Sequence, residues 1–180
     1  MPVSVALAAT LQLLLAATFV VIPVAAWRTG GRAQRAAEAE VARQGHAPGV
    51  LARHGIRFEE RAPELALALG ITVVVTALAG LNLAGAGRVL SWVLEPVIFL
   101  AVGFVTASQV FAVRYTEAAF AKSADPGVRE IDARAVIAAA SGGFPSWLRP
   151  LVLVRFGLAT LGSVLVIILL STPAADAYFS

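Results

Sequence analysis

Long apolar runs dominate the hydropathy pattern of the chain, and charged segments separate them. A helix needs about 20 apolar residues to cross the roughly 30 Å hydrocarbon core of a bilayer. Because a helix satisfies its own backbone hydrogen bonds, it is the default structure for such runs in lipid. The pattern therefore predicts an all-α, polytopic membrane protein with a bundle of four transmembrane helices. These helices cover residues 5–26, 65–86, 89–113 and 151–172.

Two other interpretations of the apolar runs fit the sequence less well. A water-soluble four-helix bundle needs a polar outer face on each helix, and these runs lack one. The first run could be a secretory signal, but no basic residue precedes it, and it exceeds the usual apolar core of about 7–15 residues. We therefore expect the first run to remain as a membrane-spanning helix.

The segments that join the predicted spans differ in length and charge. Residues 27–64 and 114–150 are long and charged, whereas only residues 87–88 separate the second and third spans. Residues 173–180 form a short tail after the fourth span. The short link, which contains Gly87, predicts that the second and third spans form a tight antiparallel hairpin.

Basic residues are distributed unevenly, and their positions predict the orientation of the spans. Of the 14 Lys and Arg side chains, seven lie within residues 28–61 and five within residues 114–149. The positive-inside rule places such segments in the cytoplasm, so both termini and the short link face outward. The net charge of +3 then indicates anionic lipid headgroups as a partner rather than nucleic acid.

Composition supports the membrane class and adds a hint of origin. Hydrophobic residues make up 59% of the chain and charged residues 14%, whereas soluble domains have about 45–50% and about 25%. The excess of Ala, and of Arg over Lys, is typical of a GC-rich bacterial genome. We therefore expect a multi-pass protein of a bacterial plasma membrane.

The long connections are predicted to contain short helices. Residues 32–44 are Ala-rich and carry pairs of opposite charge three positions apart, and residues 128–140 have an apolar stripe. Arg53, Arg57 and Arg61 lie among apolar residues at roughly helical spacing, which is typical of a stretch at the membrane surface among phosphates. The alternative is a solvated loop whose charges only set the topology.

Several kinds of chemistry are excluded or unsupported. The chain has no cysteine, which excludes disulfides, thiolate metal sites and iron–sulfur clusters. Both histidines, His46 and His54, lie in the first long connection, so no apolar run carries a histidine ligand for haem. No spacing matches a nucleotide loop, a nucleophile–base pair or a metal-ligand set. The sequence therefore indicates no catalytic residue, metal or cofactor, and it favours a protein that is not an enzyme.

Three predicted spans each carry one strongly polar group at a similar depth. At 1.5 Å per residue, Glu95 lies roughly 9 Å below the outer boundary, Gln12 roughly 10 Å and Asn82 roughly 6 Å. Burial disfavours the charged form of a carboxyl, so a cluster around Glu95 could take up a proton or a cation. In the structural alternative, Arg88 neutralises Glu95, while Gln12 and Asn82 hydrogen-bond between helices.

Arg155 is a second ionisable group at membrane depth. It lies about one turn into the fourth span, and Gln109 of the third span lies at a comparable depth. The pair could contact an anion or a lipid phosphate. In the alternative, the long Arg155 side chain extends to the inner headgroups.

Three functional hypotheses follow. The first is a small non-catalytic accessory, scaffold or regulatory subunit of a membrane assembly, bound to another membrane protein or to a second copy of itself. The alternative is a protomer of an oligomeric transporter or channel that is coupled to protons or cations through Glu95. The third is a lipid-modifying enzyme with Asp125, Glu130 and Asp132 as metal ligands, although the interleaved arginines favour a solvated helix face there.

Overall fold

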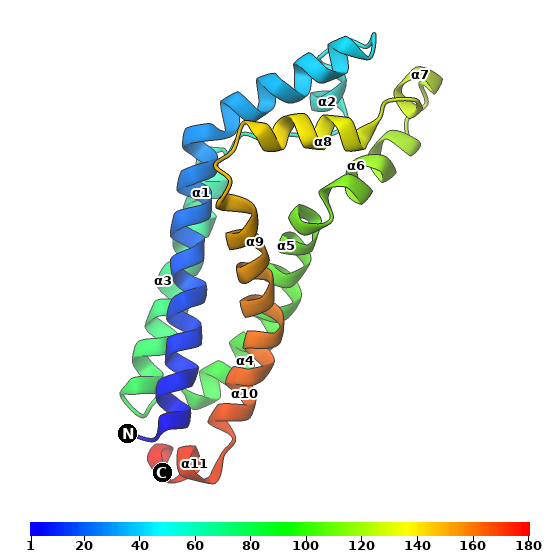
Figure 1. Cartoon of the computed structure of the whole chain (residues 1–180). Coiled ribbons are helices and arrows are strands. Elements are labelled where there is room, and N and C mark those ends of the chain that lie inside the picture. The colour runs from blue at the N-terminus through cyan, green and yellow to red at the C-terminus, as the bar shows by residue number, and fades with distance from the viewer. The chain divides into compact units, whose positions relative to one another are not determined.

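The computed structural model describes all 180 residues, and helices account for 80% of it, with no strands. Four helices are long and apolar enough to cross a membrane (Figure 1). They are α1 (Val3–Arg43), α3 (Ala62–Leu83) and the helices that cover Arg88–Val110 and Leu148–Leu170. This arrangement confirms the predicted all-α class with four membrane-spanning helices.

The chain divides into two units, which are described separately. Unit 1 comprises residues 1–22, 63–110 and 150–180. Unit 2 comprises residues 23–62 and 111–149. Unit 1 therefore holds most of the four apolar runs, and unit 2 holds most of the two long connections.

The third spanning helix of unit 1 is not a regular α-helix throughout. It consists of α4 (Arg88–Val97), the π-helix η1 (Ile98–Val102) and α5 (Gly103–Val110). Pro96 lies just before η1 and lacks the N–H that would donate to the carbonyl of Trp92. The π-helical turn follows directly where this proline disturbs the regular hydrogen-bond ladder.

The fourth spanning helix has the same three-part construction. It consists of α9 (Leu148–Gly157), η2 (Leu158–Gly162) and α10 (Ser163–Leu170). The predicted tail is itself helical, because α11 (Pro173–Phe179) follows. The Thr172 hydroxyl caps α11 by accepting a hydrogen bond from a backbone N–H of its first turn.

A tight turn joins α3 to α4. It occupies residues 84–87, slightly earlier than the predicted link at 87–88. Gly85 has a φ of 75°, which is the left-handed conformation that glycine adopts without steric cost. This turn reverses the direction of the chain between α3 and α4.

Apolar side chains of unit 1 lie both inside and outside the bundle. Leu15, Phe19 and Val75 belong to a buried cluster. The outer surface is apolar as well, since large side chains there are 68–77% exposed, among them Leu100, Phe104 and Leu161. Apolar surface of this extent is unfavourable in water and favourable in hydrocarbon. The exposed faces therefore argue against the water-soluble bundle.

The two long connections fold together into unit 2. Figure 1 shows α8 running alongside the C-terminal part of α1, and both lie in this unit. Its other helices are α2, α6 and α7. The bounds are Val50–Arg53 for α2, Ala112–Ala121 for α6, Pro126–Arg129 for α7 and Ala133–Gly142 for α8.

Unit 2 has its own hydrophobic core. Val41 of α1, Leu51 of α2, Phe120 of α6 and Val136 of α8 are all at most 2% exposed and belong to one cluster. Gly143 allows the end of α8 to approach α1, because a Cβ there would lie 2.4 Å from backbone atoms of Ala33. Burial of apolar area is the main favourable term in such packing, so the two connections stabilise each other.

Two local expectations are corrected by unit 2. The first span and the helix expected at 32–44 are one continuous helix, α1, because Pro23 removes only a single hydrogen-bond donor from it. The helix at Val50 ends at Arg53, and Val50 itself is 2% exposed. Its apolar residues therefore pack into the core of unit 2 and do not form the lipid-facing stripe expected at the membrane surface.

Candidate functional site

Glu95 lies in the interior of unit 1, although it is ionisable. Its position on α4 faces the other helices, and the side chain is 1% exposed. Ser91 lies one turn earlier on the same face of α4, and its side chain is also fully buried. A carboxyl that is enclosed among membrane-spanning helices is energetically costly unless it is hydrogen-bonded or neutralised.

Amide side chains link three helices to this carboxyl. Gln12 of α1 donates from Nε2 to Glu95 Oε1 at 2.8 Å. Asn82 of α3 donates from Nδ2 to Gln12 Oε1 at 3.0 Å and to Ser91 Oγ at 2.7 Å. The structure thus brings together Gln12, Asn82 and Glu95, the three groups that the depth arithmetic placed at similar levels. We call these residues, with Ser91 and Ser163, the Glu95 cluster.

Ser163 adds the fourth spanning helix to the Glu95 cluster. Its hydroxyl borders the Glu95 carboxyl, but it makes no hydrogen bond of regular geometry and is 1% exposed. Asn82 Oδ1 is a second buried oxygen without a hydrogen-bond partner. Because buried polar atoms are nearly always hydrogen-bonded, two unbonded oxygens in one cluster require an explanation.

Arg88 does not neutralise Glu95. Its Nη1 instead donates to Asp176 Oδ1 of α11, and its guanidinium lies 4.5 Å from the centre of the Trp92 ring. The hydroxyl of Tyr178 on α11 also donates to the Leu83 carbonyl at 2.6 Å. Helix α11 therefore holds Arg88 away from Glu95, and the structural alternative based on an Arg88–Glu95 pair is wrong.

Arg155 and Gln109 of unit 1 contact each other, and the contact is partly buried. Arg155 Nη2 donates to Gln109 Oε1, and the guanidinium lies 5.3 Å from the centre of the Phe19 ring. Arg155 is 4% exposed, so it is buried among helices instead of extending to the surface. The interaction with the ring and the amide stabilises the charge there. Arg155 is thus engaged with protein groups in the interior, whereas Gln109 is itself exposed.

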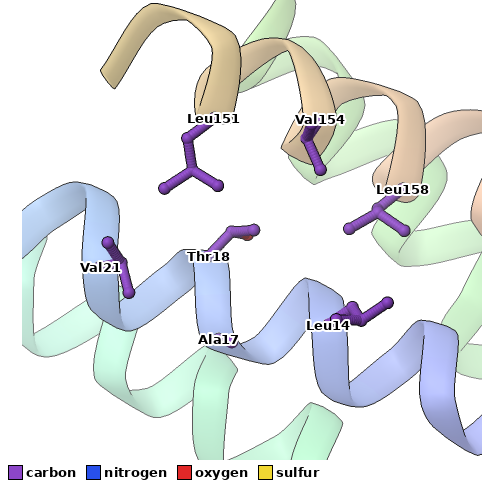
Figure 2. A pocket seen from close by; sticks show the side chains of 7 residues that line it. All are labelled: Leu14, Ala17, Thr18, Val21, Leu151, Val154 and Leu158. Atoms are coloured by element: carbon purple, nitrogen blue, oxygen red, sulfur yellow. The ribbon is translucent and has the colours of Figure 1, made fainter. Parts of the chain in front are cut away.

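A pocket on unit 1 is almost entirely apolar. Figure 2 shows its lining side chains, which come from α1 on one side and from α9 and η2 on the other. The only polar one, Thr18, uses its hydroxyl to donate to the Leu15 carbonyl at 2.6 Å. This pocket offers shape for hydrocarbon but no group for chemistry. The lining residues are Leu14, Ala17, Thr18, Val21, Leu151, Val154 and Leu158.

The acidic residues of unit 2 that could hold a metal serve other purposes. Asp125 Oδ1 accepts the Gly127 N–H at 2.9 Å, and Asp132 Oδ1 accepts the Arg134 N–H at 2.9 Å. Both aspartates therefore cap the helices that follow them. Glu130 lies near them in sequence, but no group of three or more acidic or histidine side chains is positioned to hold a metal ion.

The surface of unit 2 is strongly basic. All 12 of its Lys and Arg side chains are exposed, including Arg53, Arg57 and Arg61. Local pairing affects the acids among them. Arg43 contacts Glu40 at 2.6 Å and, with the hydrogen bond from Gln44, lowers the pKa of Glu40 to about 2. Glu40 is therefore ionised at any physiological pH.

Three residues of these contacts were not singled out from the sequence: Ser91, Ser163 and Asp176. The sequence indicates them to different degrees. Ser91 lies four positions before Glu95, so helical periodicity alone places it on the same face. Ser163 is part of a small-residue spacing in the fourth span and carries no further signal. Asp176 lies in an apparent tail, and its pairing with Arg88 depends on how α11 folds back.

No family model, no curated protein and no solved structure matches the chain. The assignment of function therefore depends on the physical features of the two units.

Proposed function

We propose that the protein is a non-catalytic subunit of a membrane assembly in a bacterial plasma membrane, and that unit 2 is the part that binds a partner protein. The observation that carries this proposal is the hydrophobic core that both long connections build together. Segments that only joined membrane spans would need no shared core. A folded unit offers a rigid surface, which lowers the entropic cost of binding a partner.

Charge supports a cytoplasmic location for unit 2. It holds 12 basic and eight acidic side chains, a net charge of +4, whereas unit 1 holds only two arginines. Basic segments remain on the cytoplasmic side of bacterial membranes, and anionic headgroups attract them there. Both termini would then face outward. The partner that suits this arrangement is another membrane protein that presents an acidic cytoplasmic surface, because opposite charges steer association.

The test is affinity purification of the full chain from its own membranes in mild detergent. We expect wild type to retain a second membrane protein in stoichiometric amount. The variant Phe120→Ala, which removes the largest side chain from the core of unit 2, should lose that partner. Phe104→Ala is the matched control, since Phe104 is 68% exposed on the surface of unit 1. A partner-free wild-type particle that moves solute in liposomes would refute the proposal.

The Glu95 cluster favours a second candidate, a protomer of a small transporter or channel. A buried carboxyl contacted by polar groups from other spanning helices is the kind of group that couples transport to a cation. Liposome flux that is present in wild type and lost in Glu95→Gln would favour this candidate. Equal flux in both proteins, or none in either, would remove Glu95 from that role.

A further inference from the structure

We propose that the Glu95 cluster binds one monovalent cation, either a proton or an alkali-metal ion. The inference does not depend on the partner-binding function, because it concerns unit 1 and is tested on the purified chain. Loss of the partner in a purification would leave it unaffected, and failure of cation binding would leave the partner-binding proposal standing.

No neighbouring side chain compensates the charge of an ionised Glu95. The groups that contact it are Gln12 of α1 and Ser163 of α10, and neither can titrate. Asn82 and Ser91, which complete the cluster, are also neutral. An isolated ionised carboxylate that is enclosed by apolar helices is strongly disfavoured, so it requires a counter-charge.

No charged side chain of unit 1 supplies that counter-charge. Arg88 is paired with Asp176, and Arg155 donates to Gln109. The remaining charged residue, Glu64, lies in the exposed first turn of α3 and has the wrong sign. A single bound cation of charge +1 would neutralise Glu95, whereas a divalent ion would leave an excess positive charge in the same apolar surroundings.

The Ser163 hydroxyl is a second feature of the cluster that suits a cation. It borders the Glu95 carboxyl, is 1% exposed and makes no hydrogen bond of regular geometry. Hard cations take oxygen ligands, carboxylates among them. A proton would also neutralise the carboxyl, since a protonated Glu95 donates one hydrogen bond, either to Ser163 Oγ or to Gln12.

The amide chain can accommodate both states of the site. In the observed arrangement Asn82 donates to Gln12, and Gln12 donates to Glu95. Rotation of both amides by half a turn reverses the chain, so that a protonated Glu95 donates to Gln12 and Gln12 donates to Asn82. The reversed chain supplies a donor to the Asn82 oxygen. The change between the two protonation states of Glu95 therefore needs only the rotation of these two amides.

The experiment compares thermal unfolding of wild type and Glu95→Gln, as full chains in detergent micelles. In the proton arm, pH is varied at constant ionic strength in buffers that contain no potassium. In the metal arm, sodium chloride replaces N-methylglucamine chloride at constant pH. An ion that binds only the folded state stabilises it. When the ion is present at a saturating concentration, each tenfold change in that concentration changes the folding equilibrium constant by up to tenfold. We expect the stability difference between the two proteins to follow pH or sodium.

Controls separate binding from simple hydrogen bonding. Glu64→Gln makes the same chemical change at the exposed end of α3 and should behave as wild type in both arms. Ser163→Ala deletes one small hydroxyl beside the carboxyl and leaves Glu95 and Gln12 in place, so the protein should still fold, and the dependence on the active ion should shift. If Glu95→Gln does not fold, the shift measured in Ser163→Ala decides the test. Stability differences that stay constant across pH and sodium would overturn the proposal.

Discussion

Phe120→Ala tests whether unit 2 is a folded unit in its own right. Phe120 is 2% exposed in the shared core, and its ring packs edge-on against His54 with the ring centres 6.0 Å apart. Truncation of a buried Phe to Ala costs about 3–5 kcal/mol. The unit has 79 residues, from which a stability of about 4–12 kcal/mol is expected at 0.05–0.15 kcal/mol per residue.

The loss is therefore a large share of the stability expected for unit 2. We expect hydrogen exchange in α8, measured by mass spectrometry on the full chain in micelles, to increase strongly in Phe120→Ala. Exchange in α10 should stay as in wild type, because apolar residues of unit 1 retain their own packing.

Phe104→Ala provides the comparison, since it deletes the same atoms from a side chain that is 68% exposed. It should leave exchange in α8 unchanged. The reasoning would be refuted if both variants raised exchange in α8 equally, or if Phe120→Ala had no effect. Either result would mean that the two connections do not depend on a common core.

Three further predictions concern local interactions. A double-mutant cycle between Gln12→Ala and Glu95→Ala should give a coupling energy of about 0.6–2 kcal/mol in unfolding measurements, the range for hydrogen bonds between membrane helices, and a coupling near zero would contradict the 2.8 Å contact. Gly143→Ala should destabilise unit 2 by about 1–3 kcal/mol in the exchange assay, because its methyl group would lie 2.4 Å from the backbone of α1. Glu40, with its pKa lowered from 4.5 to about 2 by Arg43, should stabilise the fold above its unfolded pKa, and this contribution should disappear as the pH falls towards about 2. A carboxyl NMR titration midpoint near the ordinary value would refute that pairing.

The spanning helices could be predicted because hydrocarbon makes a simple demand on sequence. A run of about 20 apolar residues is needed, and few other structures satisfy it. The same regularity let the rise per residue bring Gln12, Asn82 and Glu95 to similar depths. The contact between these residues depends on the helix faces that they occupy and on how the helices pack. No local sequence pattern records that packing.

Long-range contacts explain what could not be predicted. One alternative pairs Arg88 with Glu95, seven residues away, but its partner Asp176 is 88 residues away in the chain. The backbone N–H of Asp132 donates to Gln44 Oε1 across the same separation of 88 residues. Residues 32–44 and 128–140 were correctly expected to contain helix, yet nothing in either segment alone indicated that they would share a core.

The central claim is that both connections form one folded unit on the cytoplasmic side. Because the chain has no cysteine, Gln44→Cys and Asp132→Cys can be introduced together without background. The Asp132 N–H lies 2.8 Å from the Gln44 side chain, so a short membrane-impermeant bismaleimide should join the two residues. We predict that mass spectrometry will detect this cross-link in inside-out vesicles and not in intact cells. A cross-link in intact cells, or none in inside-out vesicles, would contradict the claim.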